Sequence, residues 1–326
     1  MHAITQTQEG GPETLQWTEV ATPKPGPGEV LVKTVAAGIN RADSLQRRGY
    51  YPPPKGVTNV LGLEASGVVE SVGEGVDNFA PGNPVVALLS GGAYAEYFVA
   101  PAGQLIPPPD NVELVESAAL IEVAATVLSN LERVHLRKGE TFLVHGGAGG
   151  IGAFAIQYAK YMGVRVITTA SEPKLDYCRE LGADVVIDYN TDWPERVKNA
   201  TDGKGVDVIL DIIGAKYLQP NVDCLAQDGR MVIIGMQKGV KGELNIGKLL
   251  NKRGTITATS LRFRPTEQKS EIAQAVREKI WPLYEDETLS LPDITVFPME
   301  NAAEAHEMLD SGQLMGKIVL AVDQPR

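Results

Sequence analysis

The pattern of apolar and polar positions changes twice along the chain and divides it into three stretches. Up to about residue 120, short extended runs are separated by turns rich in glycine and proline. These runs cover residues 29–35, 67–72, 84–89 and 95–99. Short strands with turns at close spacing are typical of a barrel-like β domain.

From residue 116 the pattern becomes one of alternating helices and strands. An apolar, alanine-rich segment over residues 117–134 has helical periodicity. Six strands are predicted beyond it, with a helical segment in each gap, over residues 141–145, 164–169, 185–188, 206–212, 230–235 and 255–260. This alternation predicts an α/β domain with a parallel, doubly wound six-stranded sheet. The runs VDVILDII and RMVIIG are nearly continuously apolar, as expected of strands covered on both faces.

The last stretch, from about residue 265, is mixed. The pattern predicts amphipathic helices over residues 267–284 and 302–311 and a final strand over 316–322. The pattern alone leaves open which domain this tail joins.

A glycine-rich turn follows the strand expected at 141–145. Gly147, Gly149 and Gly152 have the G-x-G-x-x-G spacing, and a helix is expected at 151–162. In such loops the first glycine allows the tight turn, the second lets the backbone approach a pyrophosphate, and the third lets helix and strand pack closely. A plain glycine-rich turn is the alternative, but the strand–turn–helix context favours dinucleotide binding. The candidate cofactor-binding residues of the loop are Gly147, Ala148, Gly149, Gly150, Ile151 and Gly152.

The choice between NADPH and NADH depends on the end of the second expected strand. Dinucleotide sites place the residue that contacts the ribose 2′ position about 20 residues past the glycines, and Ser171 stands there. A hydroxyl can donate to a 2′-phosphate, and Lys174 and Tyr189 could add a positive charge and a phenol. Glu172 is the alternative, as the ribose-binding acid of an NAD enzyme. Ser171 could instead be only a helix N-cap, Lys174 a solvated side chain and Tyr189 a packing residue. We favour NADPH.

The amino-acid composition limits which classes of binding partner are expected. The 326 residues suffice for two domains, and the net charge of −11 comes from 41 acidic and 30 basic residues. This acidity argues against nucleic acid and against an anionic membrane surface as partners. No apolar run approaches the roughly 20 residues of a membrane span, and no signal peptide is visible. Cys178 and Cys224 are interpreted as buried small hydrophobes, which is consistent with a reducing cytoplasm.

Motifs along the whole chain resemble the medium-chain dehydrogenase/reductase superfamily. They include GGPE, INRADSLQRRG, NVLGLEASGVVESVG, the glycine loop, KLLNKRG, SLRFR and GKIVL, in the order of that family. Within the superfamily the chain is similar to the zinc-free quinone oxidoreductases, closest to the p53-inducible NADPH quinone oxidoreductase type. One position departs from the family pattern, since Ile121 stands where a proline is usual.

The resemblance implies a fold and an assembly. A GroES-like β-barrel domain is expected over residues 1–122 with 266–326, because the tail of the family returns to the first domain. A Rossmann domain is expected over residues 123–265. A homodimer is implied as well.

The resemblance also bears on metal. Zinc-dependent relatives use a thiolate, an imidazole and a carboxylate. Asn40 stands at the place of the first ligand cysteine, and Gly62-Leu63-Glu64 has a leucine where histidine is usual. Zinc sites need such nitrogen and sulfur donors. No catalytic or structural metal is therefore expected.

The same resemblance suggests where substrate and cofactor bind. It places the pocket near Asn40, Asp43, Tyr51 and the SLRFR segment, with Asn40 and Tyr51 as catalytic candidates and Asp43, Tyr51 and Thr126 as substrate-binding candidates. Asn40 could hydrogen-bond an acceptor carbonyl or the nicotinamide ribose, or could only cap a helix near Arg41. Tyr51 could stack on a quinone or donate a proton, or could only pack its loop. Further cofactor contacts are implied for Asn40, Gly235, Met236, Ser260, Leu261, Arg262 and Lys317.

Three functions fit these observations. The leading one is an NADPH-dependent oxidoreductase that transfers a hydride to a quinone without metal. A reductase of activated C=C bonds in enones or enoyl thioesters needs the same hydride geometry. The third is a non-catalytic, NADPH-binding structural protein. No serine–histidine–acid or cysteine–histidine set is evident, so acceleration mostly by proximity is expected.

Overall fold

The computed structural model describes residues 1–322, which form two compact units. The β-rich unit comprises residues 1–125 and 261–322, and the α/β unit comprises residues 126–260. The expected boundaries lay at 122/123 and 265/266. Each unit is described by itself below.

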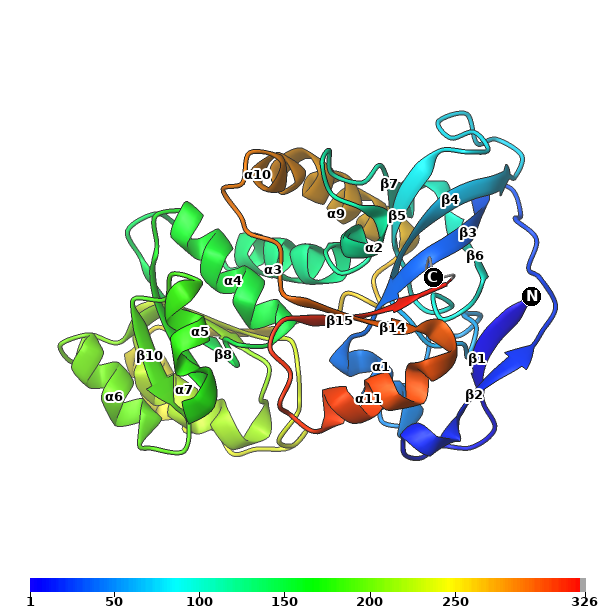
Figure 1. Ribbon diagram of the computed structural model, residues 1–326. Helices are drawn as coiled ribbons and strands as arrows, with labels where there is room; N and C mark the ends of the chain where they lie inside the picture. The colour runs from blue at the N-terminus through cyan, green and yellow to red at the C-terminus, as the bar shows by residue number, and fades with distance from the viewer. Residues whose placement is uncertain (323–326) are drawn as a thin grey trace. The chain divides into compact units, whose positions relative to one another are not determined.

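The β-rich unit is built on a seven-stranded sheet. Its strand order is β14-β15-β3-β4-β5-β7, and β6 also pairs with β3 (Figure 1). A separate antiparallel pair is formed by β1 and β2. The strands are β1 (His2–Gln6), β2 (Leu15–Glu19), β3 (Glu29–Gly38), β4 (Glu64–Val72), β5 (Pro84–Leu88), β6 (Tyr97–Pro101), β7 (Leu105–Ile106), β14 (Ile294–Pro298) and β15 (Lys317–Ala321).

The ten-residue strand β3 organises this unit because it has three partners. Its first half pairs with β6, its second half pairs with β15, and β4 follows it along the other side. The tail of the chain thus completes the sheet that the first residues begin. Alternate side chains of these strands fill one core, which includes Val30, Val32, Val69, Val85 and Leu320.

The helices of the β-rich unit are short apart from α9. They are α1 (Arg41–Arg47), α2 (Leu114–Ser117), α9 (Thr266–Lys279), α10 (Trp281–Glu285) and α11 (Ala302–Asp310). The helix expected over residues 267–284 is broken at Ile280, because Pro282 lacks the N–H that a continuous helix would need.

The α/β unit contains a six-stranded sheet of order β10-β9-β8-β11-β12-β13, in which every strand pair is parallel. This confirms the predicted doubly wound sheet. Its strands are β8 (Thr141–His145), β9 (Arg165–Ala170), β10 (Val185–Asp188), β11 (Val206–Asp211), β12 (Leu225–Ile233) and β13 (Thr255–Ala258).

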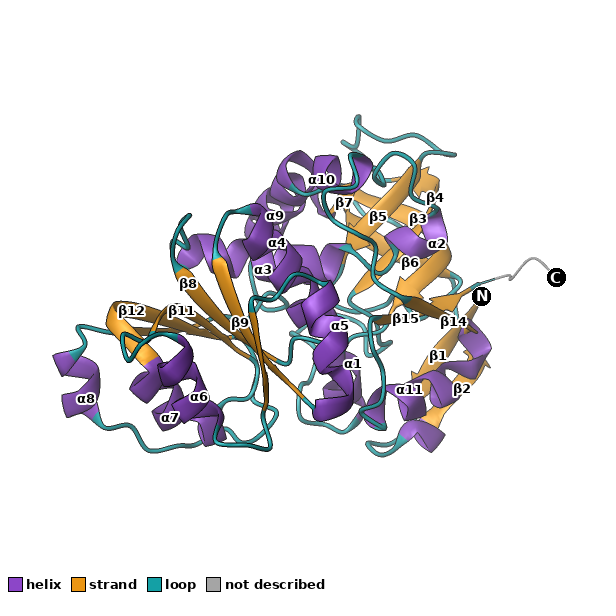
Figure 2. Ribbon diagram, turned by 60° about the vertical axis from the view of Figure 1, so that its left-hand side comes forward, coloured by secondary structure: helices purple, strands orange, loops and turns teal. Residues whose placement is uncertain are grey.

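Helices cover both faces of this sheet. They are α3 (Ile121–Arg133), α4 (Gly150–Tyr161), α5 (Leu175–Glu180), α6 (Trp193–Ala200), α7 (Leu218–Cys224) and α8 (Ile246–Asn251). Trp193 of α6 and Val222 of α7 pack with Leu143, Ile167 and Met231 of the strands, whereas α4 and α5 lie on the opposite side of the sheet (Figure 2). Short 3-10 helices lie at Pro12–Thr14, Ala102–Gln104, Glu172–Lys174, Ala215–Tyr217 and Met299–Asn301.

The helical segment expected over residues 117–134 is α3, which begins later than expected, at Ile121, because Ser117 ends the separate helix α2. The Ser117 hydroxyl donates to the Glu113 carbonyl and helps to close α2. A new helix then begins at Ile121, where Glu64 Oε2 accepts the Glu122 backbone N–H at 2.9 Å. A carboxylate from a distant strand therefore satisfies one of the free donors at the start of α3.

Candidate active site

The turn between β8 and α4 has the close packing that its glycines predict, with one difference. The residue with positive φ is Gly146, at 73°, so the tight turn is made one residue before Gly147. A Cβ on Gly147 would lie 2.2 Å from Thr168 Oγ1, and a Cβ on Gly152 would lie 2.3 Å from the Gly146 carbonyl oxygen. Both glycines are therefore required for close packing.

Gly149 has a different surrounding. A Cβ there would meet only the Gly146 carbonyl oxygen, at 3.6 Å, so the space beside this residue is open. In residues 1–322, no hydrogen bond uses the backbone N–H groups of Gly150, Ile151 and Gly152, the first residues of α4. Free N–H groups beside an open space fit a pyrophosphate.

The other expected cofactor residues of the α/β unit follow the carboxyl ends of neighbouring strands. Ser171 follows β9, Tyr189 follows β10, Gly235 and Met236 follow β12, and Ser260 follows β13. Because all six strands are parallel, these ends lie along the same edge of the sheet as the glycine loop. This is the edge where doubly wound sheets bind ligands.

Ser171 and Tyr189 are held close together at this edge, because the Tyr189 N–H donates to the Ala170 carbonyl at 3.1 Å. Ser171 and Lys174 are partly exposed, and Glu172 is exposed beside them. Ser171 precedes a 3-10 turn and makes no side-chain cap. The α/β unit therefore presents both the NADPH candidates and the NADH alternative at one place. Thr126, in α3, is 7% exposed, and its part in substrate binding stays a prediction.

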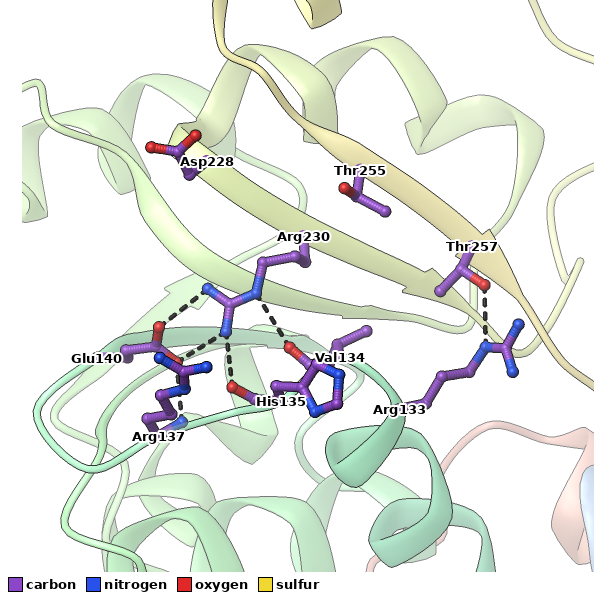
Figure 3. A pocket seen from close by; sticks show the side chains of 9 residues that line it. All are labelled: Arg133, Val134, His135, Arg137, Glu140, Asp228, Arg230, Thr255 and Thr257. Atoms are coloured by element: carbon purple, nitrogen blue, oxygen red, sulfur yellow. Dashed lines mark hydrogen bonds and ion pairs between the residues drawn. The ribbon is translucent and has the colours of Figure 1, made fainter.

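A pocket of about 650 Å³ lies at the opposite edge of this sheet (Figure 3). Arg230 fills part of it, with both terminal nitrogens on Glu140 at 2.9 and 3.0 Å, and Arg133 donates to Thr257 Oγ1. Glu140 immediately precedes β8, whereas the glycine loop follows it. The pocket is therefore distinct from the expected nucleotide site.

In the β-rich unit, Asn40, Glu64 and Lys317 form a buried network. Lys317 Nζ donates to Asn40 Oδ1 at 2.8 Å and to Glu64 Oε1 at 2.6 Å, and Asn40 Nδ2 donates to the same Glu64 oxygen at 2.9 Å. The cation and the carboxylate fix which way the Asn40 amide points. Asn40 is also the N-cap of α1, where it forms a capping box with Asp43, and one hydrogen of its amide remains for a ligand.

Asp43 holds the backbone of Asn40 in place through a hydrogen bond. Its Oδ2 accepts the Asn40 N–H at 2.8 Å and the Tyr94 hydroxyl at 3.2 Å, and its Oδ1 accepts the Gly62 N–H at 3.0 Å. Burial raises the pKa of Asp43 to about 6, against the lowering effect of these donors. The residue is fully buried, so any effect on a substrate would pass through Asn40.

Arg262 holds the loop that carries Tyr51. Its guanidinium donates to the carbonyls of Ser90 and Tyr51 and to Gln46 Oε1, at 2.7, 3.1 and 2.6 Å. It also lies 5.4 Å from the centre of the Tyr51 ring, whose edge meets Phe263. All three guanidinium nitrogens are engaged within the β-rich unit. A contact of Arg262 with a cofactor phosphate stays a prediction, as do the contacts of Leu261 and Lys317.

Glu122 was not singled out from the sequence, yet it belongs to this cluster. Burial, and after it the Glu64 carboxylate, raise the pKa of Glu122 to about 8. Glu122 lies in an apolar segment that matches no motif, so the sequence carried no signal for it. Only the fold brings it beside Glu64, which is 58 residues away in the chain.

Two buried histidines are structural in this arrangement. His306 lies between Arg47 and Tyr94, at 2.9 and 3.2 Å. His145, the last residue of β8, forms hydrogen bonds with Thr169 and Asn221. Burial lowers the pKa of His306 to about 3 and that of His145 to about 4, so both are neutral near pH 7.

Residues 1–322 contain no group of three histidine, cysteine, aspartate or glutamate side chains arranged to hold a metal ion. Within the same residues, every helix is too short or too polar to cross a membrane.

Comparisons with known proteins show the family of the chain. Residues 26–110 match the alcohol dehydrogenase GroES-like domain, and residues 150–278 match the zinc-binding dehydrogenase family. The quinone oxidoreductase of Pseudomonas aeruginosa is 35% identical over 316 residues, which cover 95% of this chain and 96% of that protein. A 2-haloacrylate reductase from a Burkholderia species is also 35% identical, over 96% of each chain.

Among solved structures, the Escherichia coli quinone oxidoreductase complexed with NADPH is similar, with a TM-score of 0.89 and 31% identity. The match covers 98% of this chain and 100% of that one. The expected GroES-like and Rossmann folds and the family resemblance are thereby confirmed.

Proposed function

Because the chain belongs to the quinone oxidoreductase family of the medium-chain dehydrogenase/reductase superfamily, we propose that it is an NADPH-dependent oxidoreductase that transfers a hydride to a quinone. The observation that carries the proposal is the open space beside Gly149, next to the free N–H groups that begin α4. Bound there, NADPH would supply the hydride.

The α/β unit supplies the contacts to the cofactor. The N–H groups of Gly150, Ile151 and Gly152 would face the pyrophosphate. Ser171, Lys174 and Tyr189 would bind the 2′-phosphate, with the Ser171 hydroxyl as a donor where a carboxylate would repel it. NADPH bound to the related Escherichia coli enzyme supports this choice.

The β-rich unit supplies the contacts to the acceptor. Asn40 would donate its remaining amide hydrogen to the acceptor carbonyl, and Lys317 and Glu64 keep that hydrogen oriented. A fixed donor loses little reorganisation energy when charge develops on the carbonyl oxygen. Tyr51 would stack on the acceptor ring or donate to its oxygen.

Reduction of an activated C=C bond is the second candidate, and the similarity to a 2-haloacrylate reductase favours it. Stopped-flow measurement of NADPH oxidation with quinones, enones and enoyl thioesters tests both. The quinone proposal requires quinones to give the highest kcat/KM. Preference for enones would assign the second function, and NADPH binding without oxidation would indicate the structural role.

We also propose a homodimer in a reducing compartment such as the cytoplasm. The family resemblance implies the dimer, and β13 at the sheet edge supports it because one row of its backbone groups is left for another strand. Cys178 and Cys224 are both free and buried, which suits a reducing compartment. Sedimentation velocity should give about twice the mass of one chain, and a monomer at micromolar concentration would contradict the dimer.

A further inference from the structure

Three carboxyl groups lie in the cluster around Asn40, and they differ in how they are bound. Both oxygens of Asp43 and both oxygens of Glu64 accept hydrogen bonds. Within residues 1–322, the Glu122 carboxyl has neither a hydrogen bond nor an ion pair. Asp43 and Glu64 are fully buried, whereas Glu122 is an intermediate position with part of its surface accessible to solvent.

Glu64 fixes the position of Glu122 relative to Asn40. One Glu64 oxygen accepts the Asn40 amide and the other accepts the Glu122 backbone N–H, both at 2.9 Å. The start of α3 and the candidate acceptor-binding amide are therefore attached to the two oxygens of one carboxylate.

The charges that face Glu122 come from every element around it. They are Glu64 on β4, Asp43 on α1, Lys317 on β15, Arg262 in the segment after β13, and Lys269 on α9. The three cations already have other acceptors, because Lys317 binds Glu64 and Asn40, Arg262 binds Ser90 and Tyr51, and Lys269 binds Ser90 Oγ. None of them forms an ion pair with Glu122 among the described residues, so the ionised carboxylate is poorly compensated there.

We propose that Glu122 is the proton donor of this site, and that its carboxyl protonates the acceptor oxygen once the acceptor has received the hydride. This role rests on the proposed function. The Glu122 O–H bond breaks as the acceptor O–H bond forms, and the carboxylate then takes a proton from water. For a quinone, NADPH, a proton and the quinone thus give NADP⁺ and the hydroquinone. The raised pKa of Glu122 is consistent with an acid that is protonated near pH 7.

The test compares Glu122→Gln, Glu122→Asp and a control, Glu271→Gln, which makes the same change on an exposed position of α9. NADPH oxidation is followed with 1,4-naphthoquinone and with 2-cyclohexen-1-one from pH 5.5 to 9.5, in H₂O and in D₂O. Glu122→Gln should lower kcat by about 100-fold with the better acceptor and leave the Kd for NADPH unchanged. The aspartate variant should keep part of the activity, and the control should match wild type.

The pH profile separates proton donation from a structural role. In the wild type, kcat/KM should fall as pH rises through about 8, and kcat should be slower in D₂O; both effects should be absent in Glu122→Gln. The inference is overturned if Glu122→Gln keeps the wild-type kcat and profile. A flat wild-type profile up to pH 9.5 would overturn it without any variant, even if Glu122→Gln failed to fold. If wild type binds NADPH but oxidises it with neither acceptor, the proposed function fails, and this inference fails with it.

Discussion

Lys317 Nζ lies 2.6 Å from Glu64 Oε1, and this ion pair crosses the strand that separates the two residues in the sheet. Lys317 begins β15, Glu64 begins β4, and β3 lies between them. Gly38 of β3 provides the space for this ion pair, since a Cβ there would lie within 3 Å of the Glu64 carboxylate and of the Ala118 carbonyl oxygen. The absence of one side chain thus lets the pair form and lets Asn40 be oriented by it.

Removal of Lys317 should destabilise the fold strongly. The side chains of Lys317 and Glu64 are 4% and 0% exposed, so Lys317→Met would leave a buried carboxylate without its cation. We expect a loss of about 3–5 kcal/mol in the free energy of unfolding, measured with urea. Lys33→Met, on an exposed position of β3, is the control and should change stability by less than about 0.5 kcal/mol. The double variant Lys317→Met with Glu64→Gln should regain part of the loss; no recovery would contradict the pairing.

Gly149→Val should abolish NADPH binding and leave the fold intact. The φ of Gly149 is −84°, which valine adopts freely, and its Cβ would enter only the open space beside the loop. Isothermal titration with NADPH should show no binding, while the far-UV circular dichroism and Tm stay near wild type. Gly152→Val is the contrasting variant, because its Cβ would clash with the Gly146 carbonyl oxygen and lower Tm. Unchanged affinity in Gly149→Val would show that the loop does not hold the pyrophosphate.

The sequence predicted the α/β unit well because its signals are local. Buried parallel strands are continuous apolar runs, and the loop between β8 and α4 carries its glycines at fixed spacing. The β-rich unit was predicted less completely from the sequence. The hairpin of β1 and β2 and the strand β14 were not predicted, because His2–Gln6, Leu15–Glu19 and Ile294–Pro298 are short and only partly apolar. Parallel pairing with β15, on the far side of α11 in the chain, stabilises β14, and no local pattern reports such pairing.

The candidate site shows the same division. Asn40 and Ser171 could be proposed from motifs and from their place relative to expected strands. The partners of Asn40 could not, since Lys317 lies 277 residues further along the chain. No acid was predicted from the sequence, because Glu122 has no motif and the charges around it come from β4, α1, β15, α9 and the segment after β13. Side-chain chemistry that depends on burial becomes visible only in the folded chain.

Acid should destabilise the wild type more than a variant without His306. The pKa of His306 is about 3 in the folded protein, against 6.5 for an exposed histidine, so the unfolded chain binds one more proton between these values. Stability from neutral His306 is thus present above pH 6.5 and is lost as pH falls, by at most about 1.4 kcal/mol per pH unit. His306→Gln lacks this dependence. The difference in unfolding free energy, wild type minus variant, should fall from pH 7 to pH 4.5; a constant difference would be inconsistent with a buried neutral histidine.

Zinc should be absent from the purified protein. Asn40 and Leu63 replace the cysteine and histidine that zinc-dependent relatives use, and the remaining carboxylate of Glu64 is bound to Lys317. Plasma mass spectrometry should find much less than one zinc per chain, and EDTA should leave NADPH oxidation unchanged. One tightly bound zinc per chain, lost together with activity on chelation, would contradict the prediction.

Ser171→Asp should change which cofactor the protein prefers. Ser171 follows β9 and lies beside Tyr189, where the 2′-phosphate of NADPH would be bound. A carboxylate there would repel the phosphate and could instead accept hydrogen bonds from the ribose hydroxyls of NADH. Loss of one charge-assisted hydrogen bond costs about 1.5–3 kcal/mol, which corresponds to a weakening of NADPH by about ten-fold to a hundred-fold. The ratio of kcat/KM for NADPH and NADH, measured with one accepted quinone, should therefore fall towards or below one.

Lys174→Ala should weaken NADPH binding by less and leave NADH binding nearly unaffected, and Glu172→Gln should leave the ratio in favour of NADPH. If wild type already prefers NADH and Glu172→Gln removes that preference, then Glu172 binds the ribose and the assignment of Ser171 is wrong.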